Sequence, residues 1–289
     1  STITLFTNEA ENNAMVVRFN SDNHPVKAGV VKEFGGVTFV PNATASPVSG
    51  ELVIENEADL VRLAKMSEVG LLGSVTSVRV AASLDMSNVE DWHGIDRFPA
   101  ITFDGGSDKG FEIKGLKAPL FLKAEGQIKN VKLTDVNIYS KDRFFLGAIA
   151  CSLISAGTGE PASLTNCEVS GAITMDNEIA LNEKYDSAYG VVAMGGLVGL
   201  TKGVMVTNCI NHANATILDI SSSDNHTALC PALAGIVGYA ANGLAADGTT
   251  ATYTCIDNCE NKGAVKYEDC AAFRHRPFVG GVVGISPSG

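Results

Sequence analysis

Two short patterns of apolar and polar residues recur along the chain and alternate with each other. The first, the Asn phrase, is an apolar run that ends in asparagine, and its copies are marked by Asn130, Asn166, Asn208 and Asn258. The second, the Gly phrase, is an apolar pair flanked by glycine, and it occupies 195–199, 234–238 and 280–284, with a degenerate copy at 147–150. Their strict alternation indicates a tandem array of structural repeats.

Neither phrase has the 3.6-residue period of a helix, which excludes a heptad array and an array of helical hairpins. Each phrase is a short run beside Gly or Asn, the pattern of a strand followed by a turn. Buried strands of parallel sheets are short and apolar, as are Leu197-Val198 and Ile236-Val237. We therefore predict an all-β solenoid of parallel strands, with loops at 174–190 and 240–252 that absorb the unequal repeat lengths.

The recurring asparagine has two interpretations. Its side chain points into the coil, or its backbone adopts a left-handed turn, which asparagine tolerates. In either case, stacking one copy over the next would join the amides in a hydrogen-bonded ladder.

Cysteine follows this asparagine in three copies, at Cys167, Cys209 and Cys259. We expect these thiols to form one column inside the coil. The seven cysteines cannot all pair within one chain, and no Cys-x-x-Cys spacing points to zinc; they are Cys151, Cys167, Cys209, Cys230, Cys255, Cys259 and Cys270. We expect buried free thiols that behave as small apolar residues.

The first third of the chain reads differently. Residues 57–68 form the clearest helical pattern, with Asn56 as the expected N-cap and Gly70 as the stop. Its apolar stripe predicts a helix that covers the open end of the solenoid. Residues 1–48, with strands expected at 14–19 and 36–40, form a small β segment or the remnant of a preceding domain, and 49–289 form the solenoid.

The repeats and the residues before them resemble the GLUG-motif repeats of Bacteroidetes surface proteins. The family's succession of short motifs is matched in order from residue 50 to 286 by 59–66, Leu84-Asp85-Met86, Trp92, Phe103-Asp104-Gly105, Gly115-Leu116, Leu120-Phe121 and 126–130. Ala234, 147–148 and 118–121 depart from the family pattern. The resemblance implies a right-handed parallel β-helix on an exported adhesin of the cell surface or outer membrane, held by a lipid anchor outside this chain.

Charge and hydropathy bear on the partners and the location of the protein. The net charge of −11 argues against nucleic acid, whose phosphates require a basic face. The uncharged run 227–246 is broken by Pro231, Gly235 and Gly238, so we read it as strand, turn and strand rather than a transmembrane helix. No signal segment or lipid-attachment cysteine stands at Ser1, so the location is an expectation from the resemblance alone.

Candidate chemistry is sparse. Glycoside cleavage needs two carboxylates across a groove, but Ile210 separates the equivalent positions of Glu168 and Glu260. The segment Asp104–Gly110 resembles a calcium loop, yet Gly106 and Gly115 stand where oxygen ligands are needed. The five histidines are scattered. We assign no catalytic, cofactor-binding or metal residue, and no cofactor.

A binding role calls for exposed aromatic rings. The candidates are Trp92, Tyr139, Phe144, Phe145, Tyr185 and Tyr189. A separate basic tip at Arg274-His275-Arg276 could contact an acidic ligand, although an ordinary exposed loop is the simpler interpretation. No ligand-binding residue is assigned. We expect a non-catalytic adhesion or recognition module for an extracellular glycan or protein; the alternatives are a polysaccharide lyase or hydrolase on the same scaffold, and a structural spacer.

Overall fold

The computed structural model describes residues 2–6, 14–18, 50–68, 70–141, 143–157, 160–176, 191–219, 230–244, 247–269 and 277–286. The chain forms two compact units, Ser1–Gly50 and Glu51–Gly289. In the first unit, β1 (Thr2–Phe6) pairs antiparallel with β2 (Ala14–Arg18). The strand expected at 36–40 lies outside the described residues.

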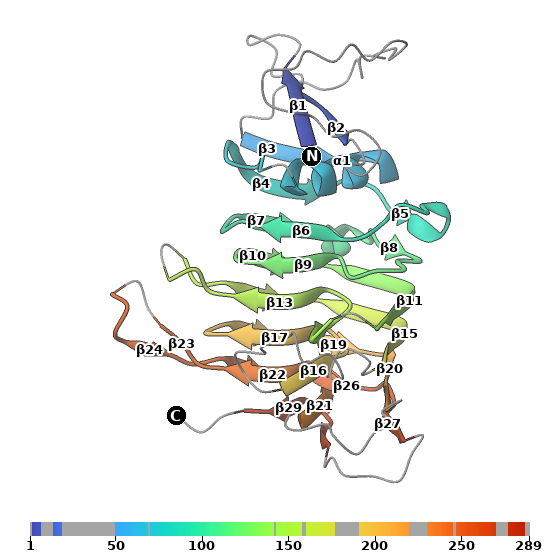
Figure 1. Cartoon of the computed structure of the whole chain (residues 1–289), viewed down its shortest axis with the longest axis vertical. Helices are drawn as coiled ribbons and strands as arrows, with labels where there is room; N and C mark the ends of the chain where they lie inside the picture. The colour runs from blue at the N-terminus through green and yellow to red at the C-terminus, as the bar shows by residue number, and fades with distance from the viewer. Residues whose placement is uncertain are drawn as a thin grey trace, which may run out of the picture. The chain divides into compact units, whose positions relative to one another are not determined.

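The second unit is built from four stacks of strands (Figure 1). Sheet 1 contains β3 (Gly50–Ile54), β4 (Val75–Val80), β7 (Thr102–Asp104), β10 (Gln127–Lys129), β14 (Ser163–Thr165), β18 (Met205–Thr207) and β25 (Cys255–Asp257). Sheet 2 contains β5 (Leu84–Asp85), β8 (Ile113–Lys114), β11 (Lys132–Ser140), β15 (Glu168–Asp176), β19 (Ile210–Asn211), β20 (Asn214–Asp219), β26 (Glu260–Asn261) and β27 (Val265–Asp269).

The other two stacks are formed by the Gly phrases and the strands before them. Sheet 3 contains β12 (Phe145–Leu146), β16 (Val191–Gly195), β21 (Cys230–Ala234) and β28 (Phe278–Gly280). Sheet 4 contains β6 (Ile95–Phe98), β9 (Phe121–Ala124), β13 (Ala150–Ile154), β17 (Val198–Lys202), β22 (Val237–Ala241) and β29 (Val283–Ile285). From β4 onward, neighbouring strands in all four sheets run parallel. This confirms the predicted all-β parallel β-helix.

Equivalent positions of successive coils stack in register and have the same surroundings, so the repeats have similar sequences. Ile128, Leu164 and Val206 are aligned on β10, β14 and β18, and all three are fully buried. Phe98, Phe103 and Phe121 fill the core of the early coils, with ring centroids 5.0–5.9 Å apart. The core is therefore a set of apolar columns inside the tube.

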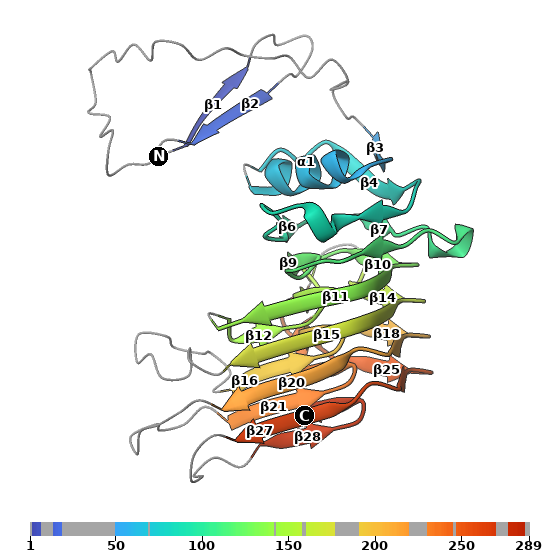
Figure 2. The same cartoon turned by 90° about the vertical axis from the view of Figure 1, so that its right-hand side faces the viewer.

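Helix α1 (Glu57–Glu68) has the predicted bounds and packs against β6 at the N-terminal end of sheet 4 (Figure 2). Asn56 Oδ1 accepts the N–H of Asp59 at 3.1 Å, and Asp59 Oδ2 accepts the N–H of Glu55 at 3.1 Å, so the N-cap is confirmed. Leu60 and Leu63 are fully buried, as a capping helix requires.

Two predicted loops begin later than expected. Strand β15 continues to Asp176, inside the loop expected at 174–190, and residues 177–190 lie outside the described part of the chain. Strand β22 continues to Ala241, and β23 (Gly243–Leu244) then pairs antiparallel with β24 (Ala251–Thr252) in a short projecting ribbon. Strands β21 and β22 confirm the strand, turn and strand expected at 227–246. In the described residues, no helix is long and apolar enough to span a membrane.

Two less regular features complete the unit. Short 3-10 turns lie at η1 (Met86–Asn88) and η2 (Ser107–Lys109). In the last described coil, Ile256, Val265 and Val283 are only partly buried, although they continue fully buried columns. The apolar columns thus reach the surface of this coil.

Candidate recognition surface

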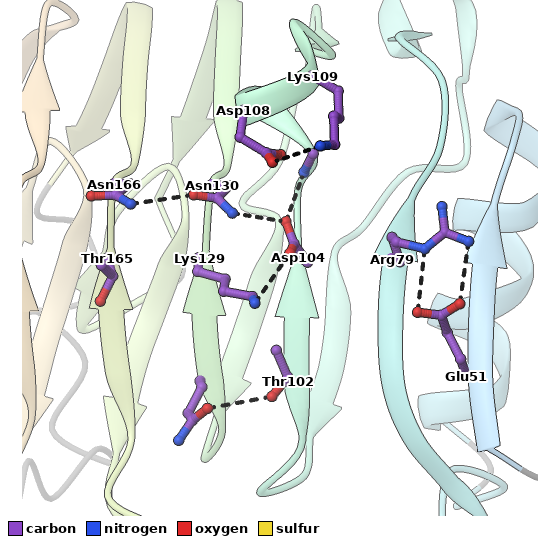
Figure 3. Close-up of polar contacts among 12 residues, drawn as sticks. Glu51, Arg79, Thr102, Asp104, Asp108, Lys109, Lys129, Asn130, Thr165 and Asn166 are labelled. Carbon is purple, nitrogen blue, oxygen red and sulfur yellow. Dashed lines mark hydrogen bonds and ion pairs between the residues drawn. The ribbon is translucent and has the colours of Figure 1, made fainter.

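The recurring asparagines form a ladder along one corner of the coil (Figure 3). Asn130, Asn166, Asn208 and Asn258 have φ between 48° and 54°, the left-handed turn. In the three later copies, Nδ2 donates to the Oδ1 of the preceding asparagine, at 3.4 Å from Asn166, 3.1 Å from Asn208 and 2.6 Å from Asn258. The three later asparagines are exposed, so the turn and the ladder are confirmed and the inward orientation is wrong.

Asp104 ends this ladder. Its Oδ1 accepts Asn130 Nδ2 and the Gly106 N–H, each at 3.1 Å, and its Oδ2 lies 3.2 Å from Lys129 Nζ. Partial burial opposes ionisation, but the Gly106 N–H, the Asn130 amide and the Lys129 ammonium outweigh it and lower the pKa of Asp104. The carboxylate that began the calcium-like segment is thus held by the chain's own donors. Within the described ranges, no three His, Cys, Asp or Glu side chains form a metal-binding group.

On the outer face of sheet 1, opposite charges face each other between β3 and β4 and between β7 and β10. Arg79 bridges Glu51 through two nitrogens at 3.2 Å each, and Lys129 pairs with Asp104 on the neighbouring strand (Figure 3). Like charges opposite each other on neighbouring strands would be unfavourable. These ions therefore act between coils of the tube.

A second asparagine, three positions after the ladder asparagine, points inward and was missed in the sequence. Asn211 is fully buried; its Nδ2 donates to Asn261 Oδ1 at 2.8 Å, and its Oδ1 accepts the Ala213 N–H at 3.0 Å. A Cβ on Gly196 would lie 2.6 Å from the Asn211 amide carbon, and one on Gly235 would lie 2.1 Å from that of Asn261. The second glycine of the Gly phrase thus makes room for this amide.

The degenerate copy obeys the same packing. In the preceding coil, Val169 replaces the buried asparagine and is aligned with Asn211. The matching position of the Gly phrase is Ala148, which is also fully buried. Where the coil has Val169 in place of the buried asparagine, the Gly phrase has Ala148 in place of its second glycine. These two changes occur together in the sequence, and they could have predicted that the buried asparagine and the second glycine are neighbours.

The three repeat cysteines lie in one column, as predicted. Cys167, Cys209 and Cys259 make equivalent Sγ contacts with the carbonyls of Thr165, Thr207 and Asp257, at 3.2–3.3 Å. The neighbouring Cys167 thiol and burial raise the pKa of Cys209, and Cys209 and burial do the same to Cys259. Cys209 and Cys259 are therefore poor nucleophiles, because the thiolate is the reactive form.

The cysteines outside this column differ in their burial. Cys151 is buried, but Cys255 is exposed on the outer face of β25, so the expectation of burial is wrong there. Its place follows from the alternation of the strand, where Ile256 points inward and its neighbours outward. The side-chain environments of Cys230 and Cys270 lie outside the described residues.

The acidic positions considered for catalysis each lie beside a basic side chain. Register aligns Glu168, Ile210 and Glu260 on β15, β19 and β26, so Ile210 separates the two carboxylates. Glu168 lies 3.2 Å from His212 Nε2, and Glu260 lies 3.1 Å from Lys262 Nζ. They stand on the outer face of a sheet, two strands apart.

Of the aromatic candidates, Tyr139 is the one that the described residues place at the surface, with 56% of its area exposed. Trp92 is buried, and its Nε1 donates to the Ala118 carbonyl at 3.3 Å. Phe144 and Phe145 are partly buried. Tyr185, Tyr189 and the tip at 274–276 lie outside the described residues. Tyr253, on the projecting ribbon, is 64% exposed and was missed, since its surroundings in sequence are unremarkable.

On the outer face of sheet 2, β15 and β20 carry uncharged side chains in the column of Tyr139 and in the column next to it. Register aligns Tyr139 with Thr174 and Thr216, while Asn137, Ala172 and Asn214 occupy the next outward column. We call these six residues the neutral patch. The Tyr139 hydroxyl donates to Asp176 Oδ2, and that carboxylate is itself buried.

Comparisons with known proteins bear on the fold. No protein-family model matches the chain, and no curated protein matches it. A solved structure described as a "putative immunoglobulin A1 protease" from Bacteroides ovatus is similar, with a TM-score of 0.57 and 20% sequence identity. The match covers 81% of this chain and 61% of that one, so this chain spans about three fifths of its solved relative. At this identity the likeness shows a shared fold, a β-structure also found in Bacteroides.

Proposed function

We propose that this chain is a non-catalytic recognition module for an extracellular glycan or protein. The motif succession resembling GLUG repeats supports export, display on the cell surface or outer membrane, and a lipid anchor outside this chain. The same resemblance supports adhesion as the role. The net charge of −11 supports partners other than nucleic acid.

The observation that carries the proposal is how the ionisable side chains are used. Asp104 pairs with Lys129 and Glu125 pairs with Lys123, and the lowered pKa values of Asp104 and Glu125 keep both carboxyl groups ionised. A general acid needs a raised pKa, and a nucleophilic pair needs two carboxylates facing one groove. The outer faces offer instead a regular surface of fixed side chains, which suits binding.

Hydrolysis is the second candidate function, in two forms. The similar Bacteroides structure bears the name of a protease, which favours peptide cleavage. Parallel β-helices also serve as scaffolds for polysaccharide cleavage. Structural spacing of another domain is the third candidate.

Binding and turnover can be measured together. The purified chain would be titrated against immobilised mucin, extracellular-matrix proteins and a polysaccharide panel, while reducing ends and immunoglobulin A1 fragments are assayed. We expect saturable binding to at least one surface with neither product. Release of either product would overturn the proposal in favour of an enzyme, and absence of binding and of product would favour the spacer.

A further inference from the structure

The neutral patch lies on the broadest continuous face of the coil. Figure 2 shows β11, β15, β20 and β27 side by side toward the viewer. Asn137, Ala172 and Asn214 occupy one outward column of β11, β15 and β20, and all three are exposed. Tyr139, Thr174 and Thr216 occupy the next. The side chains beside Tyr139 in this register, Thr174 and Thr216, are smaller than its ring, which is 56% exposed.

Charge sets this patch apart from its surroundings. None of its six side chains is ionisable at neutral pH, although the chain carries 32 Asp and Glu and 21 Lys and Arg. At the border of the patch, Lys132 and Glu168 face each other near the start of β11 and β15, and Lys266 on β27 is aligned with Thr216. A ligand that fits the patch gains nothing from charge and would meet ionic groups only at its borders. This is the complement of a neutral, hydroxyl-rich partner.

The ring of Tyr139 is held in place. Its hydroxyl donates to Asp176, and this carboxylate is only 4% exposed, so the tie is shielded from water. Asn214 is also oriented, because its Oδ1 accepts the Ala264 N–H at 3.1 Å. Binding groups that are already ordered lose little conformational entropy when a ligand arrives.

The spacing of the patch suits a chain of sugars. Neighbouring strands lie about 4.8 Å apart, so Asn137 and Asn214, two strands apart, repeat after about 10 Å. This is close to the length of two linked pyranose rings. Aromatic rings pack against the C–H faces of sugars, and amides pair with adjacent hydroxyl groups.

We propose that the neutral patch binds an uncharged polysaccharide that runs along the coil axis, with Tyr139 against one sugar ring and the amides of Asn137 and Asn214 on hydroxyls of its neighbours. This inference rests on the proposed recognition function and names its ligand class and its site.

The test is affinity electrophoresis of the purified full chain in native gels. The neutral probes are galactomannan, xyloglucan, laminarin and yeast mannan, and the charged probes are polygalacturonate and heparin. We expect at least one neutral probe to retard the chain, with little change in 0.5 M NaCl, a condition that screens charges. Tyr139→Ala is expected to raise the dissociation constant about tenfold or more. Tyr139→Phe is expected to weaken binding less, because it keeps the ring and removes the hydroxyl that donates to Asp176.

Tyr253→Ala is the matched control, because Tyr253 is at least as exposed and lies on the projecting ribbon outside the patch. Equal urea midpoints for all variants would show that each is folded. Retardation that survives Tyr139→Ala overturns the site and leaves the recognition function standing. Retardation by the charged probes alone, or by none of the six, overturns the ligand class, and the immobilised proteins then decide whether the recognition function holds.

Discussion

At the scale of single residues, backbone conformation selects the amino acid. The four ladder asparagines sit at positive φ, where a side chain costs about 1–2 kcal/mol unless it hydrogen-bonds locally. Their amides recover part of this cost by bonding to the next copy. Only a short side chain with a donor and an acceptor can do both, since each amide donates to one neighbour and accepts from the other.

Replacing Asn208 separates these two effects. Asn208→Ala loses the ladder and keeps a Cβ in the left-handed turn, so we expect a loss of about 1–3 kcal/mol in the free energy of unfolding. Asn208→Gly loses the ladder but relaxes the turn, and we expect a smaller loss. Urea denaturation of the two variants measures the difference. Equal losses would mean that the turn contributes nothing.

Acidification tests the carboxylate at the end of the ladder. The folded pKa of Asp104 is lowered, so its contribution to stability is present above the unfolded pKa of about 3.9 and is lost as pH falls through the folded pKa. In Asp104→Asn this contribution is absent at every pH. We expect the variant to be less stable than the parent at pH 7 and to lose less stability between pH 5 and pH 2. Urea denaturation of both proteins at those pH values measures the free energy of unfolding. Identical pH profiles for the variant and the parent would contradict the prediction.

At the scale of elements, each coil depends on how closely its neighbours approach. Gly196 and Gly281 hold the same position of the Gly phrase in different coils. A Cβ at Gly196 would lie 2.2 Å from the Gly235 carbonyl oxygen, whereas one at Gly281 meets nothing within 4 Å. The same sequence position is therefore essential inside the stack and permissive at its last described coil.

This contrast is a direct mutational test. We expect Gly196→Ala to lower the free energy of unfolding by about 1–3 kcal/mol or more through overpacking. Gly281→Ala is the control, with an expected change within about 1 kcal/mol of zero. Thermal and urea unfolding of both variants would measure it. Comparable losses in the two would contradict the assigned packing.

The capping helix is a second element that can be tested alone. Leu63 lies on the buried face of α1 and is fully buried, whereas Lys65 on the same helix is exposed. We expect Leu63→Ala to cost about 2–5 kcal/mol, because it opens a cavity over the end of the coil. Lys65→Ala should leave the urea midpoint nearly unchanged. A small effect of Leu63→Ala would show that α1 is not needed to close this end.

At the scale of the whole β-helix, stacking decides which groups meet water. Successive coils bury Cys167 and Cys209, while the outward position of Cys255 remains exposed. Stacking also turns each outward position into a column, so that one charge pattern holds coils together on sheet 1 and an uncharged pattern forms the neutral patch on sheet 2.

Thiol labelling reports on this stacking. We expect Cys255 to react with a maleimide within minutes in the native chain at pH 7.5. Cys167 and Cys209 should remain protected, both by burial and, for Cys209, by a raised pKa. In urea all seven cysteines should react. Peptide mass spectrometry identifies the modified sites, and rapid native labelling of Cys209 would contradict a closed stack.

The sequence by itself determined the repeat, the strand and turn character, the helix at 57–68 and the cysteine column. Each of these depends on local periodicity or on identical residues that recur at equivalent positions. The N-cap at Asn56 was readable for the same reason, because the residues that make it are adjacent in the chain.

Only the tertiary structure decided which side of the coil each polar residue faces. Asn208 lies outside and Asn211 inside, although they are only three positions apart in the chain, because Asn208 lies in the turn and Asn211 lies on β19. Tyr139 depends on Asp176, 37 residues away, and Gly196 on the Gly235 carbonyl of the next coil. Such contacts join coils through space, and loops of unequal length conceal their register in the linear sequence.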